Sequence, residues 1–412
     1  MNTDLDKLKP YPFENLNALK AGITPPSELV HIALSIGEPK HLAPEFVKQA
    51  LVSALDKLSA YPLTKGAPEL RQTISNWLTK RFQLQLVDPE SQVLPVNGTR
   101  EALFAFAQTV VDRSITSLTE ANTAPLPAPP LVLSPNPFYQ IYEGAALLAG
   151  AEPLFLNCTD ANNFAPDFDS VSPETWEQCQ LIYICTPGNP TGAVLDIPTL
   201  QKLIALADQF DFVIASDECY SEIYGDESNP PPGLLQACAD MDRHDYHRCV
   251  VFHSLSKRSS LPGLRSGFVA GDAEILQSFL RYRTYHGSAM SVPTQQASIV
   301  AWNDEKHVRE NRNKYRQKFQ VFQQVLGDIL PLHLPDAGFY LWADTRPAKK
   351  GTDEDFAREL FAQQNITVLP GRYLARRADG INPGEDRVRM ALVASVNECR
   401  EAAERIKKFI TT

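Results

Sequence analysis

The sequence lacks any apolar stretch that approaches the roughly 18 residues needed to cross a bilayer. Its 412 residues begin with Met-Asn-Thr-Asp-Leu-Asp, so acidic residues stand where a secretory leader carries positive charge. Neither a membrane-spanning protein nor an exported one has this pattern. We therefore expect a cytoplasmic protein.

Cysteine is also scarce and has no pattern. The seven cysteines form an odd set without any Cys-x-x-Cys pair, whereas a disulfide framework or a zinc knuckle needs paired, regularly spaced cysteines. His244 and His247 lie three positions apart in a polar segment, but a metal site would need an aligned third ligand. We predict no bound metal.

Positive charge is in deficit. The chain has 39 Lys and Arg against 49 Asp and Glu, a formal net charge of -10, which disfavours nucleic acid or an anionic membrane surface as a partner. Neither a Walker loop nor a Gly-x-Gly-x-x-Gly motif occurs, which disfavours nucleotide and nicotinamide cofactors. Any anionic ligand must therefore be bound by a few local cations.

What the chain does have is an ordinary globular composition, with 43% hydrophobic and 21% charged residues. Its length suits a large α/β domain with a smaller companion. Between about residues 90 and 270, short apolar runs alternate with amphipathic ones, which predicts a mostly parallel sheet buried on both faces. The expected strands are 92–96, 131–134, 153–156, 181–185, 212–216, 249–253 and 267–270, and the helices among them include 100–111, 139–149 and 197–209.

The pattern changes near Pro293. A long charged helical stretch continues through Leu330, followed by a strand, a helix, two strands and a final helix over 396–409. We expect a large domain over 46–290 and a smaller α+β domain built from 1–45 and 291–412.

Lys257 follows one of the expected strands and has Ser254, Ser256 and Arg265 around it in sequence. Ligands of open α/β sheets bind beyond the carboxyl ends of strands, so these side chains would face one crevice. The serines and the arginine suit a phosphate. Burial and cationic neighbours lower the pKa of an amine, so that it can attack a carbonyl near neutral pH. Taken alone, a solvated surface lysine is the commoner case.

Asp217 follows a second strand, and Asn189 lies in a loop after a third. A buried carboxylate at Asp217 would need a cationic partner, and the protonated ring nitrogen of a pyridine cofactor would supply one. A helix N-cap is an equally good interpretation of this aspartate.

Four motifs occur in a fixed order. They are Asn-Pro-Thr-Gly at 189–192, Asp217-x-x-Tyr220, Ser254-x-Ser256-Lys257, and Arg265 eight positions after the lysine. Together they resemble the fold-type-I pyridoxal-phosphate aminotransferases of classes I and II, from Ser35–Pro39 near the start to Arg387–Arg389 near the end. The resemblance implies an α/β large domain with a mostly parallel seven-stranded sheet, a smaller α+β domain, pyridoxal 5′-phosphate, amino-acid and 2-oxo-acid substrates, and a homodimer.

The resemblance also implies roles for the central residues. Lys257 would hold the cofactor covalently and then move a proton between the substrate Cα and C4′ of the cofactor. Asp217 would keep the pyridine nitrogen protonated. Tyr220 and Asn189 would hydrogen-bond the phenolic oxygen, although core packing is an alternative role for the tyrosine. Arg389 would bind the substrate α-carboxylate with its planar fork.

Further cofactor and substrate contacts follow from the same resemblance. Gly98, Thr99 and Arg100 would place the start of a helix at the phosphate, unless they form only a helix cap. Ser254, Ser256 and Arg265 would complete this phosphate site, Tyr139 would stack on the cofactor ring, and Gly37 would contact the substrate.

Two positions leave alternatives open. Tyr61 resembles the tyrosine that reaches the phosphate of the neighbouring subunit, but a loop tyrosine facing solvent is the alternative. Arg387 lies on the same side of the last strand as Arg389, so strand periodicity alone does not separate the two. The resemblance favours Arg389.

The opening residues 8–13 and the segment 280–287 resemble the bacterial N-succinyldiaminopimelate aminotransferases. This implies transfer between glutamate or 2-oxoglutarate and N-succinyl-LL-2,6-diaminopimelate or its 6-oxo partner, in lysine and diaminopimelate synthesis. The distal carboxylates of these substrates would need local cations, and Lys20, Arg281, Arg283 and Arg372 are candidates. A solvated helix face is at least as good an interpretation of Arg281 and Arg283.

Three other functions compete. An aspartate or aromatic aminotransferase, or a pyridoxal-phosphate carbon–sulfur lyase, would use the same cofactor residues. A noncatalytic regulatory protein that binds pyridoxal phosphate is the alternative of a different class, but it has no need for a lysine placed to react.

Overall fold

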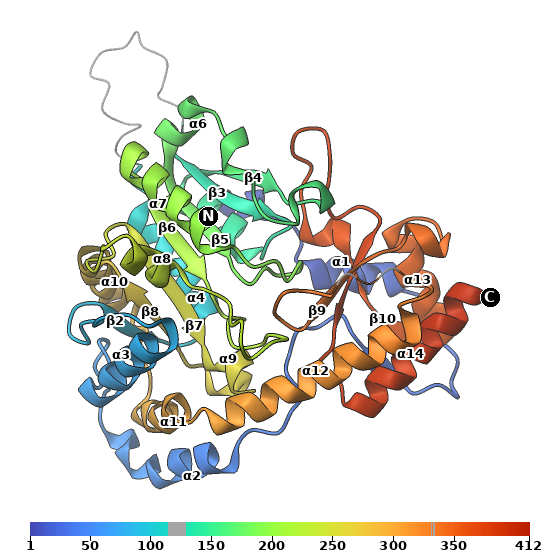
Figure 1. Ribbon diagram of the computed structural model, residues 1–412, viewed down its shortest axis with the longest axis horizontal. Helices are drawn as coiled ribbons and strands as arrows, with labels where there is room; N and C mark the ends of the chain where they lie inside the picture. The colour runs from blue at the N-terminus through green and yellow to red at the C-terminus, as the bar shows by residue number, and fades with distance from the viewer. Residues whose placement is uncertain (114–128, 331, 333) are drawn as a thin grey trace.

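The large lobe is built on a seven-stranded sheet in the computed structural model, which describes residues 1–113, 129–330, 332 and 334–412 (Figure 1). The strand order is β2-β8-β7-β6-β5-β3-β4. Strand β8 runs opposite to the other six strands, so the predicted mostly parallel sheet is confirmed. The strands are β2 (Val93–Val96), β3 (Leu131–Asn136), β4 (Glu152–Asn157), β5 (Cys179–Cys185), β6 (Val213–Asp217), β7 (Cys249–Ser254) and β8 (Gly267–Gly271).

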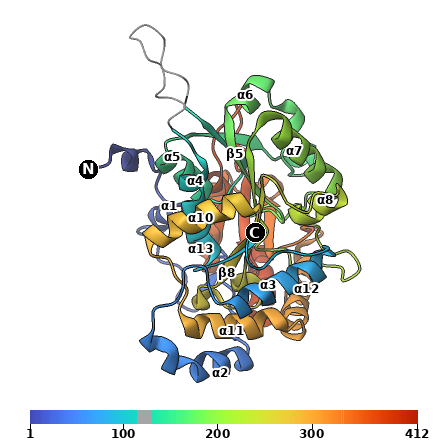
Figure 2. The same ribbon diagram turned by 90° about the vertical axis from the view of Figure 1, so that its left-hand side faces the viewer.

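Both faces of this sheet are buried, as the apolar runs predict. In β5, Leu181 and Tyr183 enter one apolar core while Ile182 and Ile184 enter another, because successive strand residues point to opposite faces. Figure 2 shows the two helical layers. One contains α4 (Thr99–Val110), α5 (Ile141–Ala149) and α10 (Ala273–His286), and the other contains α3 (Pro68–Phe82), α6 (Pro173–Gln178), α7 (Ile197–Phe210) and α8 (Leu234–Asp240).

The small lobe joins the two ends of the chain. Ile32 and Leu34 share an apolar core with Phe322, Met390 and Phe409. Its strands are β1 (Ile32–Ala33) paired with β10 (Ile366–Thr367), and β11 (Leu369–Pro370), β12 (Arg387–Ala391) and β9 (Tyr340–Asp344) in an antiparallel sheet, with α1 (Pro12–Lys20), α13 (Asp353–Gln364) and α14 (Val396–Thr411) beside them. The residue boundaries between the two domains stay a prediction.

The long helical stretch expected from Pro293 to Leu330 is wrong in one respect, because it is two helices, α11 (Val292–Asn303) and α12 (Lys306–Leu326). Asp304 has an extended backbone, and its carboxylate accepts the His307 N–H at 2.8 Å, so a new helix starts there. Helix α11 packs on α2 (Glu45–Ser53) and α3 in the large lobe. Helix α12 runs on to α14, and so connects the two lobes (Figure 1).

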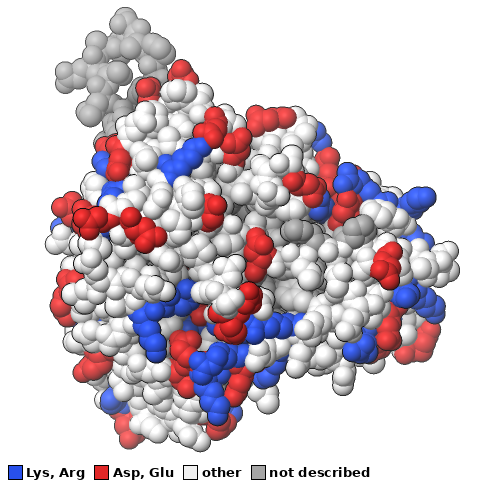
Figure 3. Space-filling model, viewed as in Figure 1, with Lys and Arg blue, Asp and Glu red and all other residues white. Residues whose placement is uncertain are grey.

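The remaining elements are short. They are α9 (Leu255–Arg258) and the 3-10 helices Thr3–Lys7, Leu55–Ser59, Asp160–Asn162, Phe168–Ser170, Pro262–Leu264, Arg346–Ala348 and Gly371–Leu374. Within the part of the chain that the structure describes, we find no helix with the length and apolar character needed to cross a membrane. On the face drawn in Figure 3, basic side chains are interspersed with acidic ones.

Candidate active site

A cavity of about 590 Å³ lies beyond the carboxyl ends of β5, β6 and β7 and extends to β9 and β12 of the small lobe. The residues that the resemblance implies for binding the cofactor and the reacting end of the substrate all line it, except Gly98 and Tyr61. Parallel strands bring residues far apart in sequence to one edge of the sheet, which is why separate motifs meet here.

Lys257 projects into this cavity from the short helix α9, which begins as soon as β7 ends. The Ser254 hydroxyl accepts the Ser256 N–H at 3.1 Å and caps the helix. The Lys257 Nζ donates to the Gly37 carbonyl at 2.5 Å. Burial lowers the pKa of Lys257 to about 8, and the nearby guanidinium of Arg389 acts in the same direction. A substantial fraction of this amine is therefore neutral near pH 8.

Asp217 ends β6 and is only 5% exposed. Its carboxylate accepts the Tyr142 hydroxyl at 2.8 Å and the Cys219 N–H at 3.2 Å, and both donors are neutral. Burial raises the pKa of Asp217, and the bonds from Cys219 and Tyr142 oppose that effect. A cation in the cavity would be stabilised here. The helix N-cap interpretation is wrong, because the chain after Asp217 continues in turns and the next helix begins only at Leu234.

Arg389 reaches the cavity from β12. Its two terminal nitrogens donate to the Asn189 side-chain oxygen at 3.0 Å and to the Ser35 carbonyl at 2.7 Å. Its Nε is buried without a hydrogen-bond partner among the described atoms, which favours an anionic ligand. Arg387, by contrast, forms an ion pair with Asp160 and does not line the cavity. This placement separates the two arginines, which strand periodicity alone did not.

The Tyr220 hydroxyl shares a hydrogen bond of 2.9 Å with Tyr340, a residue of β9. The Tyr340 ring centre lies 4.5 Å from the Arg389 guanidinium. Burial raises the pKa of Tyr220, so its hydroxyl stays protonated and can donate. The Tyr220 ring is thus buried, its hydroxyl is hydrogen-bonded, and the side chain lines the cavity.

The start of α4 is a candidate anion site. Gly98 has φ +86°, and a Cβ there would collide with the Arg265 guanidinium. The Ser254 and Ser256 hydroxyl oxygens are 3.0 Å apart on the same cavity wall. A helix start, two hydroxyls and a guanidinium suit a phosphate group. With Lys257 and Asp217 beside it, this donor set fits a phosphorylated pyridine aldehyde.

Arg100 and Tyr139 contact each other at the cavity wall. The Arg100 Nε donates to the Tyr139 hydroxyl at 2.6 Å, and the guanidinium lies 5.9 Å from the ring centre. Burial raises the pKa of Tyr139, so this side chain is neutral. Thr99, the first residue of α4, is in polar contact with the Cys219 sulfur at 3.1 Å.

Sequence reasoning missed three residues of this site, namely Tyr142, Cys219 and Tyr340. Tyr142 lies in α5, three positions after Tyr139, and Cys219 lies inside the Asp217-x-x-Tyr220 motif. Tyr340 comes from the small lobe, and no local pattern links it to Tyr220.

The cations proposed for the distal carboxylates lie outside the cavity lining. Lys20 lies 5.0 Å from a phenylalanine ring centre, and Arg372 forms ion pairs with two acidic residues of α13. Arg281 is exposed. The solvated helix face expected for Arg283 is wrong, because this side chain is fully buried and forms an ion pair with Glu101 at 2.7 Å.

Two further predicted residues lie away from this cavity. Tyr61 is fully exposed to solvent. His244 and His247 pair with Asp242 and Asp272 respectively, and the described residues contain no cluster of potential metal ligands.

Comparison with known proteins agrees with this geometry. The sequence model of the family described as aminotransferase class I and II matches residues 30–406. An LL-diaminopimelate aminotransferase from Nitratidesulfovibrio vulgaris strain Hildenborough is 30% identical over 409 residues, which cover 98% of each chain.

Two solved structures are similar along almost the whole chain. An aminotransferase from Neisseria meningitidis Z2491 is 50% identical, has a TM-score of 0.91, and covers 98% of this chain and 99% of its own. The aminotransferase AspB from Helicobacter pylori 26695 is 33% identical, has a TM-score of 0.86, and gives the same coverage.

Proposed function

Because the chain belongs to the class I and II aminotransferases, a pyridoxal-phosphate-dependent family, we propose that it transfers an amino group between glutamate and the 6-oxo precursor of N-succinyl-LL-2,6-diaminopimelate. The observation that carries this choice of substrate is that Tyr11, Pro12 and Phe13 line the cavity. These residues belong to the segment that carries the more specific resemblance. They come from outside the large lobe and would meet the part of a substrate that lies far from Lys257.

The cofactor, when bound, supplies an aldehyde carbon for the amino group and an aromatic ring that accepts electron density from Cα. Lys257 would hold it through Nζ, and Asp217 would keep a proton on the ring nitrogen. Gly98, Ser256 and Arg265 belong to the group of residues that would hold its phosphate.

The substrate is oriented by Arg389, whose two terminal nitrogens can rotate from Asn189 and the Ser35 carbonyl onto a carboxylate. Fixing the α-carboxylate directs the Cα–H bond of the substrate toward the Lys257 amine. With a pKa of about 8, that amine can take the proton from Cα and later return one. The hydroxyl of Tyr220 would donate to the oxygen substituent of the cofactor ring.

A second candidate is transfer on free LL-2,6-diaminopimelate without the succinyl group. It is favoured by the relative that is 30% identical along the whole chain and is named LL-diaminopimelate aminotransferase. Both candidates carry an α-carboxylate beside the reacting amino group, so they share the requirement for Arg389. They differ in the acyl group at the far end of the substrate.

A donor panel tests these candidates on the holoenzyme. N-succinyl-LL-2,6-diaminopimelate and free LL-2,6-diaminopimelate are compared as amino donors to 2-oxoglutarate, with glutamate formation as the readout. We expect the succinylated donor to have the higher kcat/KM. A higher value for the free diamine would replace the first candidate with the second. Faster transfer from aspartate or phenylalanine, or pyruvate release from a thioether amino acid, would contradict both.

Two expectations stay predictions. We propose a homodimer in which Tyr61 of one protomer reaches the phosphate site of the other, which is supported by its full exposure in the single chain. Sedimentation of wild-type protein and cofactor affinity of Tyr61→Phe test this. The cytoplasmic location also stays a prediction.

A further inference from the structure

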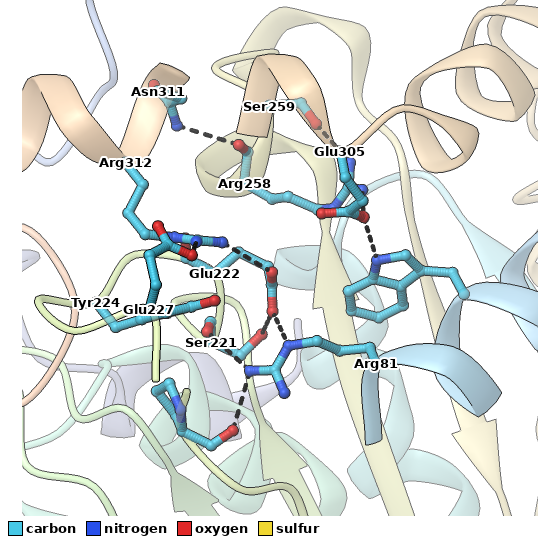
Figure 4. Close-up of polar contacts among 12 residues, drawn as sticks. Arg81, Ser221, Glu222, Tyr224, Glu227, Arg258, Ser259, Glu305, Asn311 and Arg312 are labelled. Atoms are coloured by element: carbon cyan, nitrogen blue, oxygen red, sulfur yellow. Dashed lines mark hydrogen bonds and ion pairs between the residues drawn. The ribbon is translucent and has the colours of Figure 1, made fainter. Parts of the chain in front are cut away.

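The short helix α9 leaves backbone carbonyls in need of partners at its end. A helix of four residues cannot satisfy its last carbonyls by internal bonds. The side-chain amide nitrogen of Asn311, from α12, donates to the Lys257 carbonyl at 3.0 Å and to the Arg258 carbonyl at 3.1 Å. Figure 4 shows the Asn311 carboxamide pointing from α12 to the backbone of Arg258. One buried amide therefore fixes the backbone from which the Lys257 side chain starts.

The orientation of Asn311 is itself fixed. Its oxygen accepts from the His41 Nδ1 at 2.7 Å, and the Nε2 of the same ring lies 2.7 Å from the Lys318 Nζ. An ammonium group can only donate, so Nε2 is the acceptor and Nδ1 carries the proton. Burial lowers the pKa of His41 to about 4, so the ring is neutral near pH 7. Lys318, His41 and Asn311 thus form one directed chain of hydrogen bonds that ends at Lys257.

The residues that precede His41 contact the other end of Lys257. The Gly37 carbonyl accepts from the Lys257 Nζ, and the His41 carbonyl accepts the Ser260 hydroxyl at 2.9 Å. The segment 37–41 therefore contacts the reactive amine directly and holds the lysine backbone through Asn311. A shift of His41 would move both ends of Lys257.

Helix α12 provides a rigid support for Asn311. The next residue, Arg312, donates to the Glu222 carbonyl at 2.9 Å and forms an ion pair with Glu227 at 2.5 Å (Figure 4). Its guanidinium lies 3.8 Å from the Tyr224 ring centre. Because Tyr220 lies in the loop that follows Asp217 and leads directly into these residues, α12 contacts both that loop and the helix that carries Lys257.

We propose that Asn311 is a positioning residue for Lys257, oriented by the neighbouring His41. It sets the place of the amine relative to the substrate Cα and touches neither substrate nor cofactor. The inference rests on the family reaction and does not depend on which diaminopimelate derivative is the substrate.

The test compares Asn311→Leu with Gln295→Leu. Gln295 is a matched control, because it is also a buried amide with two backbone bonds, to Ala67 at 2.6 Å and to Met290 at 2.8 Å, and does not line the cavity. We expect both variants to lower the melting temperature of the protein. Only Asn311→Leu should slow the single-turnover reaction of the bound cofactor with saturating glutamate, by roughly 10- to 100-fold, with little change in the Kd of glutamate.

A substrate-free readout accompanies the rate. The pH midpoint of the visible absorbance of the bound cofactor reports on the surroundings of the Lys257 nitrogen, so it should shift in Asn311→Leu and stay unchanged in Gln295→Leu. This readout keeps the inference testable even where glutamate proves to be the wrong donor.

His41 supplies a second pair of variants in case Asn311→Leu does not fold. His41→Asn keeps a donor near the position of Nδ1, whereas His41→Leu has none. We expect the absorbance midpoint and the single-turnover rate to change in His41→Leu and to recover in His41→Asn. If Asn311→Leu behaves like Gln295→Leu, or the two His41 variants behave alike, the proposed positioning role is wrong.

Discussion

Lys257 is partly buried and Lys318 is buried, and loss of solvent around each amine lowers its pKa to about 8. They differ in what their amines face. Lys257 opens onto a cavity of about 590 Å³ beside Asp217, whereas the Lys318 amine contacts His41 and donates to the Val393 carbonyl at 3.3 Å. A lowered pKa therefore does not identify the reactive lysine. We assign the reactive role to Lys257 because its amine opens onto a cavity with a candidate anion site and with Asp217 in its wall.

Substitution of each lysine tests this comparison, and the loss of reaction rate in Lys257→Ala is the largest effect that we expect. Lys257→Ala should slow the glutamate-driven reaction of added cofactor by roughly 10²- to 10⁴-fold or more, because a positioned proton-transfer group contributes that much. Lys318→Met should slow it by less than about tenfold, since this lysine acts only through His41 and Asn311. Stopped-flow absorbance measures both. Equal losses in the two variants would contradict the distinction.

Asp217, the acidic residue in the same cavity as Lys257, provides the next test. Asp217→Asn removes the anion and should lower the single-turnover rate by roughly 10²- to 10³-fold. Tyr142→Phe removes one hydrogen bond from a neutral donor to the same carboxylate, worth about 1.5 kcal/mol, and should lower the rate only about tenfold. The same stopped-flow assay serves for both, and a larger loss in Tyr142→Phe than in Asp217→Asn would refute the role given to the anion.

Two arginines of β12 extend the comparison to substrate binding. Arg389→Leu should lower kcat/KM for glutamate by roughly 100-fold, because two charge-assisted hydrogen bonds to a carboxylate are worth about 3 kcal/mol. Arg387→Leu should stay within about threefold, since an ion pair to an exposed carboxylate such as Asp160 contributes little. Steady-state kinetics with varied glutamate measures kcat/KM in both variants. Similar decreases in kcat/KM would contradict the assignment of Arg389 as the carboxylate-binding arginine.

The smallest effect that we expect is on how the free energy of unfolding depends on pH, through the buried Lys318. Unfolded Lys318 holds its proton up to the ordinary pKa of 10.5, whereas in the folded protein the pKa is about 8. Between these values the unfolded chain binds more protons, so the free energy of unfolding rises with pH. In Lys318→Met, the increase in the free energy of unfolding between pH 8 and pH 10 should be smaller than in the wild type by about 1–3 kcal/mol. Urea unfolding of apo-protein at pH 8 and pH 10 measures it, and parallel pH profiles of variant and wild type would contradict the lowered pKa.

Much of the fold could be predicted from the sequence, because a buried parallel sheet has a strong local signature. The runs around Leu181 and Ile214 are continuous and apolar, so both faces had to be covered. The break between α11 and α12 could not be predicted this way. It depends on the extended backbone of Asp304, and the charged sequence around it is compatible with one unbroken helix.

The site also contains residues that could be predicted from the sequence and residues that could not. Lys257, Asp217 and Asn189 could be predicted because each follows a strand within a compact motif. Tyr340 could not, since its bond to Tyr220 depends on how the small lobe packs over the sheet. The ion pair of Arg283 with Glu101 likewise joins positions 182 residues apart, and no helical periodicity reveals it.

The central claim is that the nitrogen of Lys257 is the point of attachment of the cofactor. Borohydride reduction of the holoenzyme makes a lysine–cofactor bond permanent, and peptide mass spectrometry then locates it. We predict the added mass on the peptide that contains Lys257. A modified Lys318, another labelled lysine, or no covalent adduct in a fully loaded enzyme would contradict it.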